Sequence, residues 1–186
     1  ALNQARARAR TVSCVNVEKQ LGQGEVFYSS DSDGFLLGLT VNPDNATWYA
    51  QLNRYLPSLC TRSINGVKVA ATPLCPASAA EVGLPMPGGW GTVDPYDTNN
   101  AARGGYGKSG VLGYWGRTAT PGLRYRKTGS VRKPSQKVSL YESYYYGTNL
   151  FSATFWDKMY YHLAWPRHGG TARMNMLFLD GHVEAV

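Results

Sequence analysis

Three residues near the end of the chain could bind a metal ion or transfer protons: His168, Asp180 and His182. The Asp180-Gly181 pair also has a structural explanation, because Asp-Gly between two apolar runs is typical of a tight β-hairpin with positive φ at both turn residues. The chain has only three histidines and no serine or cysteine in a nucleophile motif. We therefore expect no catalytic site, metal or cofactor; a metal-dependent hydrolase around these residues is the alternative.

The three cysteines allow one internal pair. Cys60 and Cys75 flank a predicted hairpin centred on Asn65-Gly66, and the ends of a hairpin lie side by side. A disulfide between them would close a loop of about fifteen residues and contribute roughly 3 kcal/mol. Cys14 would then be left over, and three unpaired thiols are the alternative. A bridge would indicate an oxidising compartment.

Two short segments are similar to ligand-binding loops. Residues 102–109 fit a relaxed phosphate-loop pattern, but the preceding residues are turn-like and the glycines that follow forbid the helix such a loop requires. Residues 31–34, Asp-Ser-Asp-Gly, could begin a calcium loop, but the bidentate glutamate expected further on is absent. We therefore expect no nucleotide site and a turn that ends a helix.

Aromatic residues cluster in two runs, 141–146 and 156–165. Tyr144, Trp156 and Trp165 are the candidates for a sugar-stacking platform or a subunit interface. Packing on one face of a sheet is the commoner explanation for such runs, and both are kept open.

Composition indicates one globular domain of the α+β class. The 186 residues are 17% charged and 12% aromatic, which argues against wholesale disorder. The net charge is +7, but the basic residues are scattered and no nucleic-acid-reading motif is present, so we expect no nucleic-acid partner. No segment approaches the roughly 20 apolar residues of a membrane helix.

Residues 1–28 are predicted to form a long helix whose apolar stripe (Leu2, Ala9, Val12, Leu21) packs on the rest of the domain. Ala1 enters this helix as if in mid-helix, and we expect a longer helix to have been cut here. The other predicted elements are strands at 35–40, 61–64, 67–70, 137–141, 175–179 and 182–186 and a small helix at 48–55. Residues 83–129 are glycine-rich and are predicted to be a long irregular excursion with at most a short strand at 111–115.

Both ends of the chain resemble one family. Arg167-His168-Gly169-Gly170, followed by Asn-Met-Leu-Phe-Leu-Asp-Gly-His-Val from Asn175, resembles the C-terminal signature of bacterial prepilin-type proteins, including pseudopilins of type II secretion. Residues 1–6, 14–16 and 19–21 look like the region that follows this family's membrane helix. The signature residues are His168, Asn175, Asp180, Gly181 and His182. The chain departs from the pattern in two respects: eleven residues rather than nine separate His168 from Asp180, and the family's processing site and the hydrophobic half of its first helix are missing.

The resemblance implies a pilin-like domain, residues 1–186, with an N-terminal helix packed on an antiparallel sheet and a C-terminal signature hairpin in residues 167–186. It further implies a non-enzymatic subunit of a secretion or pilus-type assembly, with other pilin-like subunits or secretion machinery as partners. A preceding hydrophobic helix would anchor it in the inner membrane, with the domain in the periplasm or at the cell surface. The alternative is a membrane-tethered module that binds polysaccharide through exposed Trp and Tyr.

Overall fold

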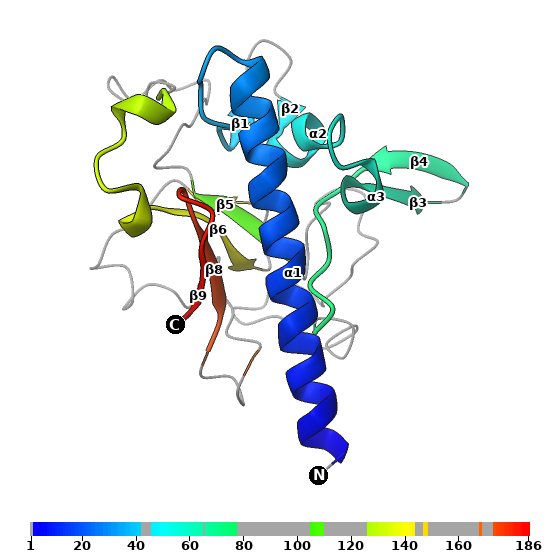
Figure 1. Ribbon diagram of the computed structural model, residues 1–186. Helices are drawn as coiled ribbons and strands as arrows, with labels where there is room; N and C mark the ends of the chain where they lie inside the picture. Colours follow the sequence, from blue (N-terminus) through cyan, green and yellow to red (C-terminus); the bar gives the residue numbers. More distant parts are fainter. Residues whose placement is uncertain are drawn as a thin grey trace.

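The computed structural model describes residues 2–41, 46–64, 66–77, 105–109, 126–143, 147–148, 168 and 173–186. Helix α1 (Leu2–Asp31) runs as one straight rod across the domain (Figure 1). Its thirty residues correspond to about 45 Å at 1.5 Å per residue. Among the described residues, no helix contains an apolar stretch long enough to cross a membrane.

Helix α1 ends in the turn that the Asp-Ser-Asp-Gly segment predicts, three residues later than expected. The backbone N–H of Gly34 donates to the carbonyl of Ser29 over 2.8 Å, and Asp33 and Gly34 have φ values of 50° and 79°. Residues in the left-handed backbone conformation, together with such a hydrogen bond, commonly satisfy the last carbonyl groups of a helix. The carboxylate of Asp31 accepts a hydrogen bond from the hydroxyl of Tyr55. The segment therefore has a structural role.

The main sheet has five strands in the order β7-β5-β6-β8-β9. Strands β5 (Gly105–Ser109), β6 (Val138–Ser143), β8 (Asn175–Phe178) and β9 (Val183–Ala185) pair with one another in the antiparallel direction. The short strand β7 (Gly147–Thr148) pairs with β5 in the parallel direction at the edge. The expected α+β class, a long helix on an antiparallel sheet with long loops, is confirmed.

Strand β5 lies in the segment expected to be an irregular excursion, and it was not predicted. The irregular excursion is therefore wrong for these five residues, which are the last five of the phosphate-loop pattern and are all buried in a strand. A Cβ on Gly105 would lie 2.3 Å from the carbonyl oxygen of Pro73, so the glycine permits the close approach that the bridge between Leu74 and Gly105 requires. The strand predicted at 111–115 lies outside the described residues.

The small helices and the hairpin between residues 48 and 70 lie on the side of α1 opposite the C-terminal hairpin (Figure 1). The hairpin predicted at Asn65-Gly66 is confirmed, with β3 (Thr61–Ile64) paired to β4 (Val67–Ala70). The small helix predicted at 48–55 is shorter, α2 (Trp48–Leu52). The strand expected at 35–40 is wrong, since only Thr40 lies in a strand. The remaining elements are β1 (Thr40–Val41), β2 (Ala46–Thr47), α3 (Pro57–Cys60) and the 3-10 helices η4 (Thr128–Ser130) and η5 (Pro134–Gln136).

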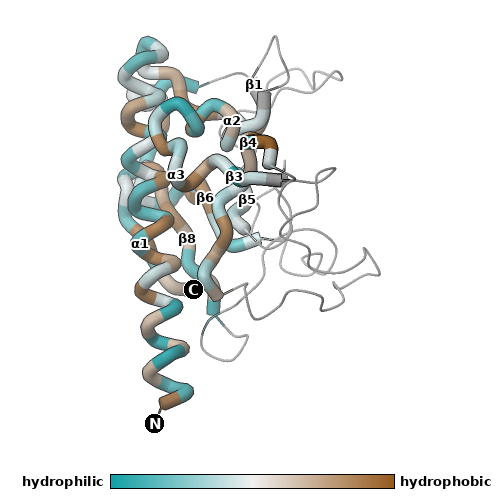
Figure 2. Tube along the Cα trace, turned by 90° about the vertical axis from the view of Figure 1, so that its right-hand side faces the viewer, coloured by the Kyte–Doolittle hydropathy of each residue, from teal (hydrophilic) through white to brown (hydrophobic). Residues whose placement is uncertain are grey.

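The face of α1 that meets the sheet differs from the predicted apolar stripe. Leu2 and Val12 are 63% and 59% exposed and Ala9 is exposed, whereas Leu21 is buried as expected. The buried residues of α1 that precede Leu21 are Cys14 and Glu18. Figure 2 accordingly shows hydrophilic and hydrophobic residues alternating along α1. The true contact face is partly polar, and for that reason an apolar-periodicity search did not find it.

The C-terminal half of α1 approaches β8 and the segment after α2 closely, because two glycines of the helix face them. A Cβ on Gly22 would lie 3.1 Å from Leu177 Cδ1, and one on Gly24 would lie 2.6 Å from Leu56 Cδ1. Leu21 joins the main core there with Trp48, Leu52, Leu140 and Leu177. The two glycines therefore set the separation between α1 and the core.

We expect Gly24→Val to lower the free energy of unfolding by about 1–3 kcal/mol, because the added side chain overlaps Leu56. Urea denaturation measures this change. Gln23→Val is the matched control, since it places the same residue on the exposed face of the same turn. A loss from Gly24→Val no larger than the loss from Gln23→Val would contradict the role of the close approach, because valine has a higher helix propensity than the glycine it replaces.

Candidate functional site

A disulfide joins α1 to the loop after β4. It links Cys14 to Cys75, with 5.5 Å between the Cα atoms, and Cys60 is a free, buried cysteine. The predicted Cys60–Cys75 pair is therefore wrong. The β3–β4 ladder ends at Thr61 and Ala70, and the chain then leaves the hairpin so that Leu74 pairs with Gly105 at the main sheet. This path carries Cys75 to α1. Burial raises the pKa of the Cys60 thiol to about 12, which makes it a poor nucleophile.

A buried carboxylate and a buried histidine meet beside this disulfide. Glu142 on β6 is fully buried, and its Oε1 lies 2.5 Å from Nε2 of His168. Asn175 on β8 donates to the same carboxylate through its side-chain Nδ2 (3.2 Å) and its backbone N–H (3.3 Å). The other ring nitrogen of His168, Nδ1, lies 3.0 Å from the hydroxyl of Thr11 on α1. The network thus connects α1 to two strands.

The disulfide and this network form one cluster of potential metal ligands. One donor atom from each of Cys14, Cys75, Glu142 and His168 lies within 4.8 Å of the others, and all four residues are buried. Sγ of Cys75 is 3.6 Å from Glu142 Oε1. Among the described residues this is the one such group. We name it the Cys–Glu–His cluster.

Glu18 adds a second carboxyl next to the Cys–Glu–His cluster. It follows Cys14 by four residues on the same face of α1 and is fully buried. Within the part of the chain that the structure describes, neither of its side-chain oxygens has a hydrogen-bond partner. Burial, and then repulsion by Glu142, raise the pKa of Glu18 well above its usual value. Next to the Cys–Glu–His cluster there is therefore a second buried carboxyl group, Glu18, that favours its neutral form.

A separate buried ion pair holds α1 on the sheet, two helical turns after Glu18. Lys108 on β5 donates to Oε1 of Glu25 and to the hydroxyl of Ser139, each over 2.6 Å. Ser139 in turn donates to Glu25 Oε2 over 2.5 Å. Burial lowers the pKa of Lys108, and the charge of Glu25 opposes this shift. The pair is enclosed by protein and serves to fix α1 on the sheet.

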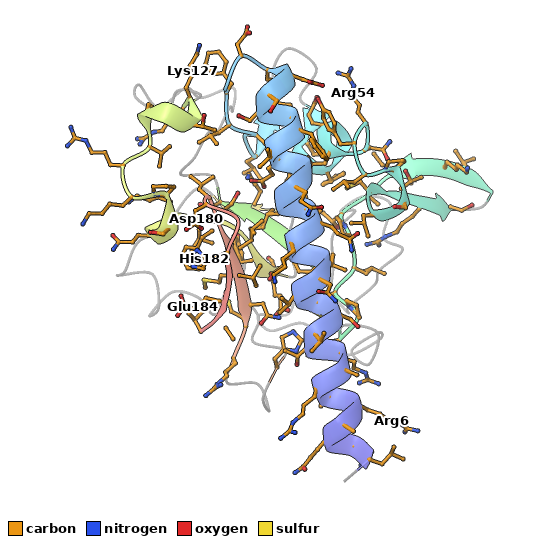
Figure 3. All side chains as sticks on the ribbon, in the orientation of Figure 1. Arg6, Arg54, Lys127, Asp180, His182 and Glu184 are labelled. Atoms are coloured by element: carbon orange, nitrogen blue, oxygen red, sulfur yellow. A yellow bond between two sulfur atoms is a disulfide. The ribbon has the colours of Figure 1, made fainter. Side chains whose placement is uncertain are left out.

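The predicted C-terminal residues do not form one site. Asp180 and His182 pair with each other in the exposed hairpin, where Asp180 Oδ1 is 2.5 Å from His182 Nδ1 and the ring of His182 stacks on Phe178 (Figure 3). His168 instead contacts Thr11 and Glu142. Within the described residues, the group that contains His168 includes neither Asp180 nor His182. The hydrolase alternative built on these three residues therefore has no assembled site.

The C-terminal turn is longer than the predicted two-residue turn. Gly181 has a φ of 88°, but Asp180 does not have a positive φ. The N–H of Gly181 donates to the carbonyl of Phe178, and the N–H of Phe178 donates to the carbonyl of His182. These bonds define a three-residue loop with glycine at its left-handed position. Asp180 contributes through its side chain, which accepts the N–H of His182 over 3.2 Å.

Sequence reasoning found His168 and Asn175 but missed Glu142, Glu18 and Thr11. Glu142 had one usable signal, namely a charged residue inside a strand whose neighbours are buried on both faces. Glu18 and Thr11 had none, because polar residues on a helix are usually exposed. The candidate aromatics Tyr144, Trp156 and Trp165 lie outside the described residues.

Comparison with protein-family models, with curated proteins and with solved structures found no match. The fold and the site together define an α+β protein in which a long N-terminal helix is packed against an antiparallel sheet and is held there by a disulfide and buried polar contacts.

We expect His168→Ala to lower the free energy of unfolding by about 3–5 kcal/mol, because it leaves the carboxylate of Glu142 buried without its main partner. His182→Ala is the control; its side chain is partly exposed, and a change within about 0.5 kcal/mol is expected. Urea denaturation of the oxidised protein measures both. Similar losses in the two variants would contradict a structural role for the buried pair.

Stability should also depend on pH through Glu18. Between the usual pKa of a glutamate and the raised pKa of Glu18, the folded chain binds more protons than the unfolded chain. The free energy of unfolding therefore falls as pH rises through this interval. In the oxidised, metal-free protein, Glu18→Gln should be more stable than the parent at neutral pH and should lose this advantage at acid pH.

Thermal unfolding across the pH range measures the effect of Glu18→Gln. The exposed Glu184→Gln is the control and should leave the pH profile unchanged. A parallel pH profile for Glu18→Gln and the parent would show that Glu18 does not titrate differently in the folded and unfolded states.

Proposed function

We propose that this chain is a non-enzymatic, pseudopilin-like subunit of a cell-envelope secretion or pilus-type assembly. The observation that supports this proposal best is the projecting end of α1. Residues 2–10 are all exposed, and this part of the helix extends beyond the sheet (Figures 1 and 2). Most helical stability in proteins comes from tertiary packing of one face, and residues 2–10 leave every face of the helix exposed. The projecting end is therefore the natural contact with other subunits.

The projecting part of α1 combines apolar and basic side chains. Leu2 and Val12 are exposed apolar residues that a neighbouring helix could cover. Arg6, Arg8 and Arg10 are exposed along the same turns, and Arg6 points into solvent at the tip of the helix (Figure 3). Basic residues next to a membrane helix are attracted to anionic lipid headgroups. This composition suits a helix that continues into an inner-membrane anchor and bundles with other pilin-like helices.

The proposed location is the bacterial envelope, with the domain in the periplasm or at the cell surface. The buried Cys14–Cys75 disulfide supports it weakly, since structural disulfides persist mainly in oxidising compartments. The non-enzymatic part of the proposal is supported by His168, because both of its ring nitrogens already have protein partners. A histidine so engaged is poorly placed to transfer a proton to a substrate.

Photo-cross-linking in cells that produce the protein from its whole gene tests assembly. A photoreactive amino acid at Leu2 or Val12 should cross-link to other pilin-like subunits, because these positions lie on the proposed helix contact. The same amino acid at Val67, which is equally exposed but lies on the β3–β4 hairpin, is the matched control. Membrane-localised protein that gives no more cross-linking from α1 than from Val67 would refute assembly through this helix.

A further inference from the structure

We infer that the Cys–Glu–His cluster binds one zinc ion when its two cysteines are reduced. The ligands are Sγ of Cys14, Sγ of Cys75, a carboxylate oxygen of Glu142 and Nε2 of His168. This site goes beyond the proposed function and does not depend on it.

The donor set and its spacing fit zinc. Sulfur, imidazole nitrogen and carboxylate oxygen are the ligands that zinc takes in four-coordinate sites. With bond lengths of about 2.0–2.3 Å, donors around one tetrahedral zinc lie up to roughly 3.8 Å apart. The four donor atoms here already lie within 4.8 Å of one another. Shifts on the order of 1 Å, together with separation of the two sulfurs on reduction, complete the geometry.

The hydrogen bond between His168 Nδ1 and Thr11 leaves Nε2, the ring nitrogen that faces the cluster, available to bind a metal ion. The hydroxyl of Thr11 donates to the carbonyl of Ala7 over 3.1 Å, so its oxygen accepts from Nδ1–H of His168. In the neutral imidazole, Nε2 then carries a lone pair and faces the oxygen of Glu142 at 2.5 Å. In the disulfide form these two atoms share one proton; in the reduced form zinc takes its place, and the two atoms move apart to about 3.3 Å, the separation of nitrogen and oxygen ligands around a tetrahedral zinc.

Further contacts orient the ligands in the manner of metal sites. Metal-binding histidines usually donate their other ring N–H to a protein oxygen, and ligating carboxylates are themselves hydrogen-bonded. Thr11 supplies the first contact and Asn175 the second, through two donors to Glu142. The two carboxyl oxygens of Glu18, buried beside the cluster without partners among the described residues, are a further sign that the cluster accommodates another group.

The disulfide and zinc forms exclude each other, because both use the same sulfur atoms. A trialkylphosphine converts one into the other: phosphorus donates two electrons to the S–S bond, water supplies the oxygen of the phosphine oxide, and its two protons give two thiols. Zinc then replaces the two thiol protons and the proton shared by His168 and Glu142, and all three pass to the buffer. The site is therefore loaded only while the cysteines are reduced.

The test is zinc and cobalt binding by the intact chain, with the free metal ions as probes. After phosphine reduction we expect one zinc per chain and a higher unfolding temperature with zinc than without. Cobalt(II) should give the intense visible bands of a four-coordinate site with thiolate charge transfer. The oxidised protein should bind neither ion, and Cys60→Ser should behave like the parent, since Cys60 is outside the cluster.

Variants of the cluster separate this site from adventitious binding. Asn175→Ala, which retains all four ligands, should weaken zinc affinity by about 10–100-fold. Cys75→Ser should remove part of the thiolate charge-transfer band, and His168→Gln provides a second ligand variant if Cys75→Ser does not fold. Zinc binding that requires Cys60, or a weak six-coordinate cobalt spectrum unaffected by Cys75→Ser and His168→Gln, would overturn the inference.

Discussion

The position of α1 on the sheet depends on one covalent bond with polar contacts on either side of it. Along a single face of the helix lie Thr11, Cys14, Glu18, Leu21 and Glu25, separated by steps of three and four residues. Their partners come from the loop after β4, from β5, β6 and β8, and from His168, which precedes β8. Only one of the five is a large apolar residue. The helix is therefore held by specific bonds more than by a hydrophobic stripe.

This arrangement makes the helix dependent on contacts distant in sequence. The disulfide spans 61 residues, and in the chain-entropy model such a closure contributes about 4 kcal/mol. The hydroxyl of Tyr106 on β5 donates to the carbonyl of Cys14 over 3.2 Å, so β5 also contacts the helix at the cysteine. Two buried ion pairs hold the helix or its surroundings, Lys108 with Glu25 and His168 with Glu142, and in each pair the partner offsets the free-energy cost of removing the charge from water. Glu18 is buried without such a partner among the described residues.

How much of this could be predicted depends on the type of signal. The Asn65-Gly66 hairpin, the long first helix and the C-terminal strand pair were predicted because turn chemistry and apolar periodicity are local properties of the chain. Strand β5 was not, because Gly-Tyr-Gly-Lys-Ser has no strand pattern and becomes a strand only by pairing with β6 and by the approach of Pro73 to Gly105. The error at Cys75 has the same origin, since sequence proximity to a hairpin favoured Cys60 and the path of the chain favoured Cys14.

The Cys14–Cys75 bond also determines how the molecule would bear a mechanical load. A pull on the projecting end of α1 passes along the helix axis and reaches Cys14 before the glycine-lined half of the helix. There it crosses a covalent bond to Cys75, whose neighbour Leu74 is bridged to Gly105 on β5. The force therefore enters the sheet at an internal strand, and Lys108 on the same strand holds Glu25 further along the helix. The β3–β4 hairpin and the C-terminal hairpin lie off this line.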